Sequence, residues 1–141
     1  MEVKVVTTEE ELRDAHAVRR VVFIEEQQVP EEIELDEHEG EATHFVVYDE
    51  DQLPIGAGRL RLFDDYGKAE RVCVLKEHRG LGVGERLMEA IEGKTKDAGL
   101  GLVKLNAQTH AEAFYKRIGY ETVSDVFYDA GIAHVAMRKE V

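Results

Sequence analysis

Several residue types are scarce in this 141-residue sequence, and each scarcity excludes a class of protein. Cys73 is the only cysteine, which excludes an internal disulfide and the usual multi-cysteine zinc sites. No apolar run approaches the roughly 20 residues that a membrane span needs, and the first residues do not form a signal-peptide pattern. Hydrophobic residues make up 43% and charged residues 34%, as in a globular protein. We therefore expect one cytoplasmic domain, residues 1–141, with no membrane and no metal.

Lysine and arginine are absent between Glu25 and Asp51, a stretch that we call the acidic segment and that holds twelve carboxylates. The net charge is −12, with 30 acidic and 18 basic residues in all, so the rest of the chain is neutral. Nucleic-acid binding needs clustered cations, and we predict no nucleic-acid partner. The acidic segment has two interpretations: a solvated loop, or a negative rim that attracts a cationic substrate.

The hydrophobic pattern predicts an α+β fold, in which a mixed, mostly antiparallel sheet is flanked by helices. Alternating apolar residues between turn signals predict strands at residues 3–7, 43–48, 53–63, 68–75, 102–107, 121–128 and 133–139. Helical spacing predicts helices at residues 8–28, 87–96 and 111–118. Thr8 and Glu11 match a capping box for the first of these helices.

The most informative stretch joins a β-branched strand, a short basic loop, three alternate glycines (Gly80, Gly82 and Gly84) and a helix. Glycine leaves backbone N–H groups uncovered, and a helix N-terminus carries partial positive charge, so the loop is suited to a phosphate or pyrophosphate. A nucleoside triphosphate loop would need Lys-Ser/Thr after Gly84, where Glu85 and Arg86 stand. A dinucleotide fold would place the glycines in the first βα unit. A purely structural role, in tight helix–strand packing, stays open.

The spacing Arg79-x-x-Gly82-x-Gly84 after a Val-x-Val strand resembles the coenzyme loop of the GNAT superfamily of N-acetyltransferases. About thirty residues later, the stretch from Ala111 to Tyr120 is similar to the second signature of that superfamily. Residues 19–36 are similar to small stand-alone bacterial members of the YjcF and ElaA type. The resemblance covers essentially the whole chain. It implies an acyl-coenzyme A N-acyltransferase fold whose parallel central strands splay apart, and acetyl transfer from acetyl-coenzyme A to a primary amine by direct attack in a ternary complex.

The resemblance also implies roles for individual residues. The coenzyme would pair with the strand backbone and bind the loop through Val72, Cys73, Val74, Arg79, Gly80, Leu81, Gly82, Val83, Gly84 and Glu85. Asn106 would contact the coenzyme near the splayed strands, with a cap of the following turn as an equal alternative. Tyr115 would lie beside the sulfur as the acid that protonates the departing thiolate; the alternative is a packing ring whose hydroxyl is in water.

The base is less well defined. Where some family members carry a glutamate before the glycine loop, this sequence has Lys68, and we predict Glu70, two residues later on the same strand face. The alternatives are carboxylates that act through water: Glu26, Glu32, Glu34 or Asp36. Arg59 and Arg61 are expected to line the acceptor side or to pair with the acidic segment. Cys73 could carry an acyl group, but no histidine partner is evident in the sequence.

Two other functions stay open on the sequence alone. One is a non-catalytic module that binds acyl-coenzyme A and signals its level. The other is an acyltransferase with a hydroxyl or another non-amine acceptor. For the leading prediction the partners are acetyl-coenzyme A and an amine on a small molecule or peptide. The amine is cationic if the acidic segment attracts it. A homodimer is a possible oligomeric state.

Overall fold

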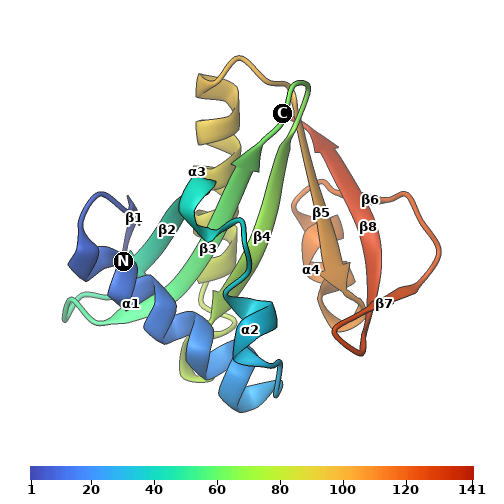
Figure 1. The fold of residues 1–141 in the computed structure, drawn as a ribbon. Helices are drawn as coiled ribbons and strands as arrows, with labels where there is room; N and C mark the ends of the chain where they lie inside the picture. Colours follow the sequence, from blue (N-terminus) through green and yellow to red (C-terminus); the bar gives the residue numbers. More distant parts are fainter.

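The computed structural model describes residues 1–141, which build one mixed eight-stranded sheet with helices on both faces (Figure 1). The strands are β1 (Glu2–Val5), β2 (Thr43–Tyr48), β3 (Pro54–Leu62), β4 (Gly67–Val74), β5 (Leu102–Gln108), β6 (Glu121–Thr122), β7 (Phe127–Asp129) and β8 (Ile132–Glu140). The α-helices are α1 (Glu9–Arg19), α2 (Glu31–Glu34), α3 (Val83–Asp97) and α4 (Glu112–Arg117). None of these helices has the length and apolar character that a membrane span requires.

The sheet has the strand order β1-β2-β3-β4-β5-β8-β6, with β7 paired to the other end of β8. All neighbours are antiparallel except β4 and β5, as the helix between them predicts. These two strands pair only from Gly67↔Val103 to Ala69↔Leu105 and then separate. Figure 1 shows the resulting V-shaped gap in the middle of the sheet. The splayed parallel strands predicted from the sequence are confirmed.

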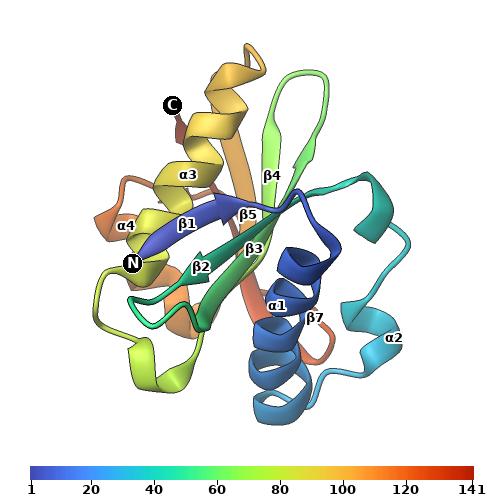
Figure 2. The same cartoon turned by 90° about the vertical axis from the view of Figure 1, so that its left-hand side faces the viewer.

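Two hydrophobic cores hold the helices on opposite faces of the sheet (Figures 1 and 2). The larger core packs α3 and α4 on one face through side chains such as Leu87, Ile91 and Tyr115. The smaller core packs α1 on the other face through Ala15 and Val18. The larger core includes residues of β3 and β4 as well as of β5 and β8, so it connects the two sides of the gap.

The first helix begins as the capping box predicts. Thr8 Oγ1 accepts a hydrogen bond from Glu11 N at 3.1 Å, and Glu11 Oε1 accepts one from Thr7 N at 2.8 Å. The helical segment extends beyond α1 as a π-helix (Arg20–Glu26), with Gln27 N bonded to Val22 O. The predicted extent of this helix is confirmed, but its second half has the wider π geometry, which the sequence did not indicate.

The prediction of one strand at residues 121–128 is wrong. The structure has two short strands there, β6 and β7, which pair with opposite ends of β8. Between them the Ser124 hydroxyl accepts a hydrogen bond from Ala136 N at 2.8 Å, so a side chain replaces the backbone partner of a regular ladder.

Candidate active site

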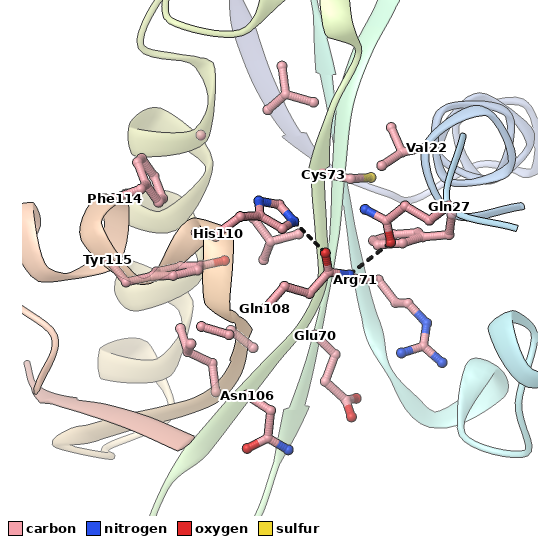
Figure 3. A pocket seen from close by; sticks show the side chains of 18 of the residues that line it. Val22, Gln27, Glu70, Arg71, Cys73, Asn106, Gln108, His110, Phe114 and Tyr115 are labelled. Atoms are coloured by element: carbon pink, nitrogen blue, oxygen red, sulfur yellow. Dashed lines mark hydrogen bonds between the residues drawn. The ribbon is translucent and has the colours of Figure 1, made fainter. Parts of the chain in front are cut away.

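A cavity of about 1250 Å³ occupies the gap between β4 and β5 (Figure 3). Its walls come from the π-helix, the acidic segment, β4, the glycine loop, β5, α4 and the β7–β8 turn. Val72, Cys73 and Val74 line it. The opposite edge of this part of β4 pairs with β3, while the edge toward β5 has no strand partner beyond Ala69. An extended ligand chain can therefore pair with β4 as an added strand.

A bulge in β4 lies where the two strands separate. Ala57 is opposite Cys73 and Arg59 is opposite Glu70, so β4 has one residue more than β3 in this interval. Arg71 within it has a φ of +56°, a conformation that non-glycine residues rarely adopt. Its guanidinium donates to the carbonyl oxygen of Ile33 at 3.0 Å, which helps to fix this conformation. Such a bulge bends a strand locally, here beside the cavity.

The glycines of the loop serve two different purposes. Gly80 and Gly82 have φ values of +82° and +84°, and a Cβ at either position would meet no atom within 4 Å. Their backbone is thus open, and α3 begins directly after Gly82. A Cβ at Gly84 would lie 3.1 Å from Phe114 Cζ, so this glycine allows α3 to pack against α4. The packing interpretation is thus confirmed for Gly84, and the phosphate-binding interpretation of Gly80 and Gly82 stays a prediction.

The basic residue of the loop is engaged by a carboxylate from the other side of the cavity. Arg79 donates to Glu26 through two nitrogens, at 2.9 and 2.8 Å, and its Nε donates to Val74 O at 2.9 Å. Both side chains are about two-fifths exposed. The hydrogen bond from Arg79 lowers the pKa of Glu26, so the pair stays ionised at neutral pH. Exposed pairs of this kind contribute little to stability, and a phosphate could displace Glu26.

Tyr115 lies in the wall formed by α4, and its hydroxyl oxygen points into the cavity in Figure 3. The ring packs edge-on against Phe114 and Tyr120, with centroids 5.0 and 5.7 Å apart. The hydroxyl makes no hydrogen bond within the protein, and burial raises the pKa of Tyr115. The phenol therefore keeps its proton at neutral pH and directs it at the cavity.

Glu70 faces the same cavity but is surrounded by cations. Its carboxylate accepts hydrogen bonds from Arg59 at 2.9 Å and from Arg61 at 2.8 Å, and Lys68 Nζ lies 3.6 Å away. Burial alone would raise the pKa of Glu70, but Arg61 and Arg59 hold it below its ordinary value. A carboxylate in this setting is a weak proton acceptor. The sequence-based prediction of Glu70 as the base stays a prediction.

The acidic segment is joined to the sheet by ion pairs with buried arginines. Arg19 and Arg59 have no exposed surface. Arg19 donates to Glu34 and Glu39, and Arg59 donates to Asp36 at 2.7 Å and to Glu39 at 2.5 Å. We call these five residues the arginine cluster. The predicted pairing of Arg59 and Arg61 with the acidic segment is confirmed, and part of that segment is neither solvated nor a free negative rim.

The cluster keeps the carboxylates of Asp36 and Glu39 ionised. Burial by itself would raise the pKa of Asp36, but hydrogen bonds from Arg59 and from the backbone of His38 lower it to about 2. Burial likewise opposes ionisation of Glu39, and hydrogen bonds from His16 and Arg19 hold its pKa well below the usual range. Two buried guanidinium groups thus have permanent counter-charges.

Two further sequence predictions can be placed. Asn106 lies in the middle of β5, opposite Ala136, and lines the cavity; it caps no turn, so that alternative is wrong. Cys73 is 5% exposed, its thiol contacts Ala57 O at 3.7 Å, and burial raises the pKa of Cys73 to about 12. Such a thiol is a poor nucleophile at neutral pH. Leu81 is exposed and its side chain does not line the cavity, so the predicted coenzyme contact of this residue would be through its backbone alone.

Gln27, Gln108 and His110 form a polar bridge over the cavity, and no motif indicated Gln108 or His110. Gln108 Nε2 donates to Gln27 Oε1 at 2.8 Å, and His110 Nε2 lies 2.6 Å from Gln108 Oε1 (Figure 3). The bridge joins the end of the π-helix to the end of β5. Alternation along β5 predicts that Gln108 shares a face with Asn106. Its contact with Gln27, far away in the sequence, can be seen only in the tertiary structure.

A protein-family model described as an acetyltransferase (GNAT) domain matches residues 6–141. The chain belongs to the GNAT acetyltransferase family. It is 50% identical over 141 residues to the uncharacterized N-acetyltransferase YjcF of Bacillus subtilis (strain 168), covering 99% of this chain and 100% of the relative. It is 34% identical over 128 residues to the protein ElaA of Escherichia coli (strain K12), covering 88% and 84%. The predicted resemblance to small bacterial GNAT proteins is confirmed.

Solved structures confirm the predicted fold. The crystal structure of a putative N-acetyltransferase from Lactobacillus plantarum superposes with a TM-score of 0.91 at 27% identity, over 99% of this chain and 97% of that one. The protein is therefore an N-acetyltransferase of the GNAT family with a mixed sheet whose parallel pair is β4–β5. No group of three or more His, Cys, Asp or Glu side chains is arranged to hold a metal ion.

Proposed function

We propose that this GNAT protein transfers the acetyl group of acetyl-coenzyme A to a primary amine, by direct attack while both substrates are bound. The observation that supports this most strongly is the convergence of three features on one cavity. These are the open edge of β4 at Val72 to Val74, the uncovered amides of the glycine loop and the proton-bearing hydroxyl of Tyr115.

Each part of coenzyme A has a matching element. The diphosphate would bind the amides from Gly80 to Glu85 at the N-terminus of α3, where the helix dipole favours negative charge. Arg79 would exchange Glu26 for a phosphate. The pantetheine arm would pair with the open edge of β4, and Asn106 on β5 would contact it from the other wall. The thioester would then lie near Tyr115.

The reaction needs a neutral amine, an electrophilic thioester and a proton for the thiolate. An alkylammonium has a pKa near 10.4, so freeing its lone pair at pH 7 costs roughly 4–5 kcal/mol. In the proposal Tyr115 donates its proton to the sulfur as the C–S bond breaks. Glu70 lies on the acceptor side and is the base predicted from the sequence.

A steady-state assay that measures released thiol tests the proposal. We expect turnover with at least one amine of a panel that contains 1,4-diaminobutane, 2-phenylethylamine, lysine amide and glycine amide. Because unpaired carboxylates such as Glu32 remain in the acidic segment, we expect the diamine to be favoured over 2-phenylethylamine. Thermal stabilisation by acetyl-coenzyme A with no turnover would instead support an acyl-coenzyme A sensor, and product mass spectrometry would separate N- from O-acetylation.

Alanine at Gly82 is expected to weaken coenzyme A binding at least about tenfold, because its methyl group would stand among the amides that hold the diphosphate. Gly99 is a matched control. Its φ is +81°, against +84° for Gly82, and a Cβ at either site meets no atom within 4 Å. Both substitutions should therefore lower the free energy of unfolding by the same amount, about 1 kcal/mol. If calorimetry shows equal coenzyme affinity for the two variants, the diphosphate does not bind at this loop.

Glutamine in place of Glu26 is expected to tighten coenzyme A binding several-fold. In the variant, Arg79 can bind a phosphate without first breaking an ion pair with a carboxylate. The effect should shrink in high salt, since both side chains are partly exposed. Glu25→Gln, one residue earlier and without an ion pair to Arg79, is the control. Weaker binding by the Glu26 variant would show that the pair instead holds the loop in its binding conformation.

The cytoplasm as location, residues 1–141 as one catalytic domain, and a homodimer are also part of the proposal. Size-exclusion chromatography with light scattering tests the last of these.

A further inference from the structure

A buried histidine lies in the acceptor half of the cavity. His134, near the start of β8, lines the cavity and is 9% exposed. It is opposite Gln108 in the β5–β8 register, and directly opposed residues share a face of the sheet. Alternation along β5 puts Asn106 on that face too. Lys68 of β4 is opposite Lys104 of β5, and Glu70 and Asn106 each follow two residues later, so Glu70 lies on the same face. His134 is therefore on the side of the sheet from which the acceptor must approach.

The contacts of the His134 ring define which nitrogen is free. Its Nδ1 lies 2.7 Å from the carbonyl oxygen of Ile132. A carbonyl oxygen can only accept, so Nδ1 carries the hydrogen and Nε2 of the neutral ring has a lone pair. No hydrogen bond within the protein uses that lone pair. The ring also stacks on Phe127, with centroids 5.9 Å apart and an interplanar angle of 21°. A basic nitrogen is thus held in a fixed orientation.

Two other candidate proton acceptors of the cavity are engaged by cations: Glu70 is held by arginines and Glu26 by Arg79. Because Gln108 donates to Gln27, its Oε1 must accept from Nε2 of His110, so only Nδ1 of that exposed ring keeps a free lone pair. His134 differs from His110 in being buried. Among the titratable groups on elements next to His134, Asp129 of β7 and His110 line the cavity, while β5 presents the uncharged Gln108 opposite it.

We propose that Nε2 of His134 accepts the proton of the acceptor ammonium, an inference that rests on the proposed acetyl transfer. The ammonium loses one proton to Nε2, and the neutral amine attacks the thioester carbon, forming the C–N bond. The C–S bond breaks as the Tyr115 hydroxyl protonates the thiolate. The second N–H proton of the adduct restores the phenol, and His134 releases its proton to solvent. One ammonium and one thioester give one amide, one thiol and one free proton.

Asparagine in place of His134 tests this, because its amide nitrogen can replace the donor at Nδ1 while Nε2 is lost. With the amine that the wild-type protein uses best, we expect kcat/KM to fall about 100-fold at pH 7. The wild-type value should rise less steeply with pH, because the protein supplies a base for the ammonium proton. The variant should continue to rise with the free-amine fraction, about tenfold per pH unit, so the difference narrows. Coenzyme A affinity should be unchanged. If His134→Asn fails to fold, His134→Gln replaces it.

His38→Gln is the control, since His38 lies outside the cavity and pairs with Glu41. Equal pH profiles of kcat/KM for the wild type and His134→Asn would overturn this inference and leave the proposed function intact. A pH-dependent loss of kcat/KM that occurs only in Glu70→Gln would identify Glu70 as the base. Absence of turnover by the wild-type protein would reject the proposed function and this inference with it. Independently of any acceptor, two-bond ¹H–¹⁵N spectra should show His134 protonated at Nδ1; an Nε2–H tautomer would contradict the assignment.

Discussion

Phenylalanine in place of Tyr115 is expected to lower kcat by a factor of about 100, within the range for loss of a general acid. The thiolate would then have to leave without the proton that the phenol supplies. The ring contacts to Phe114 and Tyr120 would remain, and the hydroxyl has no partner to lose, so stability and coenzyme A affinity should be nearly unchanged. Steady-state kinetics together with calorimetry measure both quantities.

Tyr128→Phe is the matched control, because Tyr128 is 74% exposed and does not line the cavity. It should leave kcat as it is. If both phenylalanine variants turn over at the wild-type rate, Tyr115 is a packing residue and the proton comes from elsewhere.

Glutamine in place of Glu39 is expected to lower the free energy of unfolding by about 3 kcal/mol, the loss usual when one partner of a buried ion pair is removed. Glu39 bonds to both arginines of the cluster, and neither of them has exposed surface. The midpoint of thermal unfolding should fall by roughly 10 °C. Glu37→Gln removes an exposed carboxylate from the same segment and should change the midpoint very little.

The same cluster predicts the direction of acid sensitivity. Folding lowers the pKa values of Asp36, Glu39 and Glu70, so the unfolded chain binds more protons than the folded one in acid. Their contribution is complete above the ordinary carboxyl pKa near 4 and is lost as the pH falls from about 5 toward 2. Denaturant titrations of the wild type should show this loss, and the Glu39 variant should show a smaller one. Equal slopes would contradict the proposed role of the cluster.

The sequence predicted the elements whose signals are local. The glycine loop, the capped first helix and the alternating strands each depend on neighbouring residues, and the structure confirms them. The signatures around Arg79 and Tyr115 also sufficed for the family. The strand at residues 121–128 was mispredicted as continuous because Ser124 interrupts the ladder through a side-chain hydrogen bond that residue patterns do not reveal.

The remaining features depend on partners that are far apart in the sequence. The bulge at Arg71 is fixed by the carbonyl oxygens of residues 33 and 34. The arginine cluster joins α1, the acidic segment and β3, and a charge count cannot show which carboxylates turn inward. The free Nε2 of His134 follows from the contact of Nδ1 with the carbonyl oxygen of Ile132, which only the three-dimensional structure shows.

Residues 31–41 bury only one side chain, Glu34, and it is charged. This part of the cavity wall is thus kept in place by ionic contacts, whereas the wall that carries the glycine loop rests on the apolar packing of α3. Acid should weaken the ionic wall more than the apolar one, because only the ionic contacts depend on ionised carboxylates. Under the proposed function, substitutions in the ionic wall would alter the choice of acceptor with little effect on coenzyme binding, which would let one acetyl-transfer scaffold diversify across many amines.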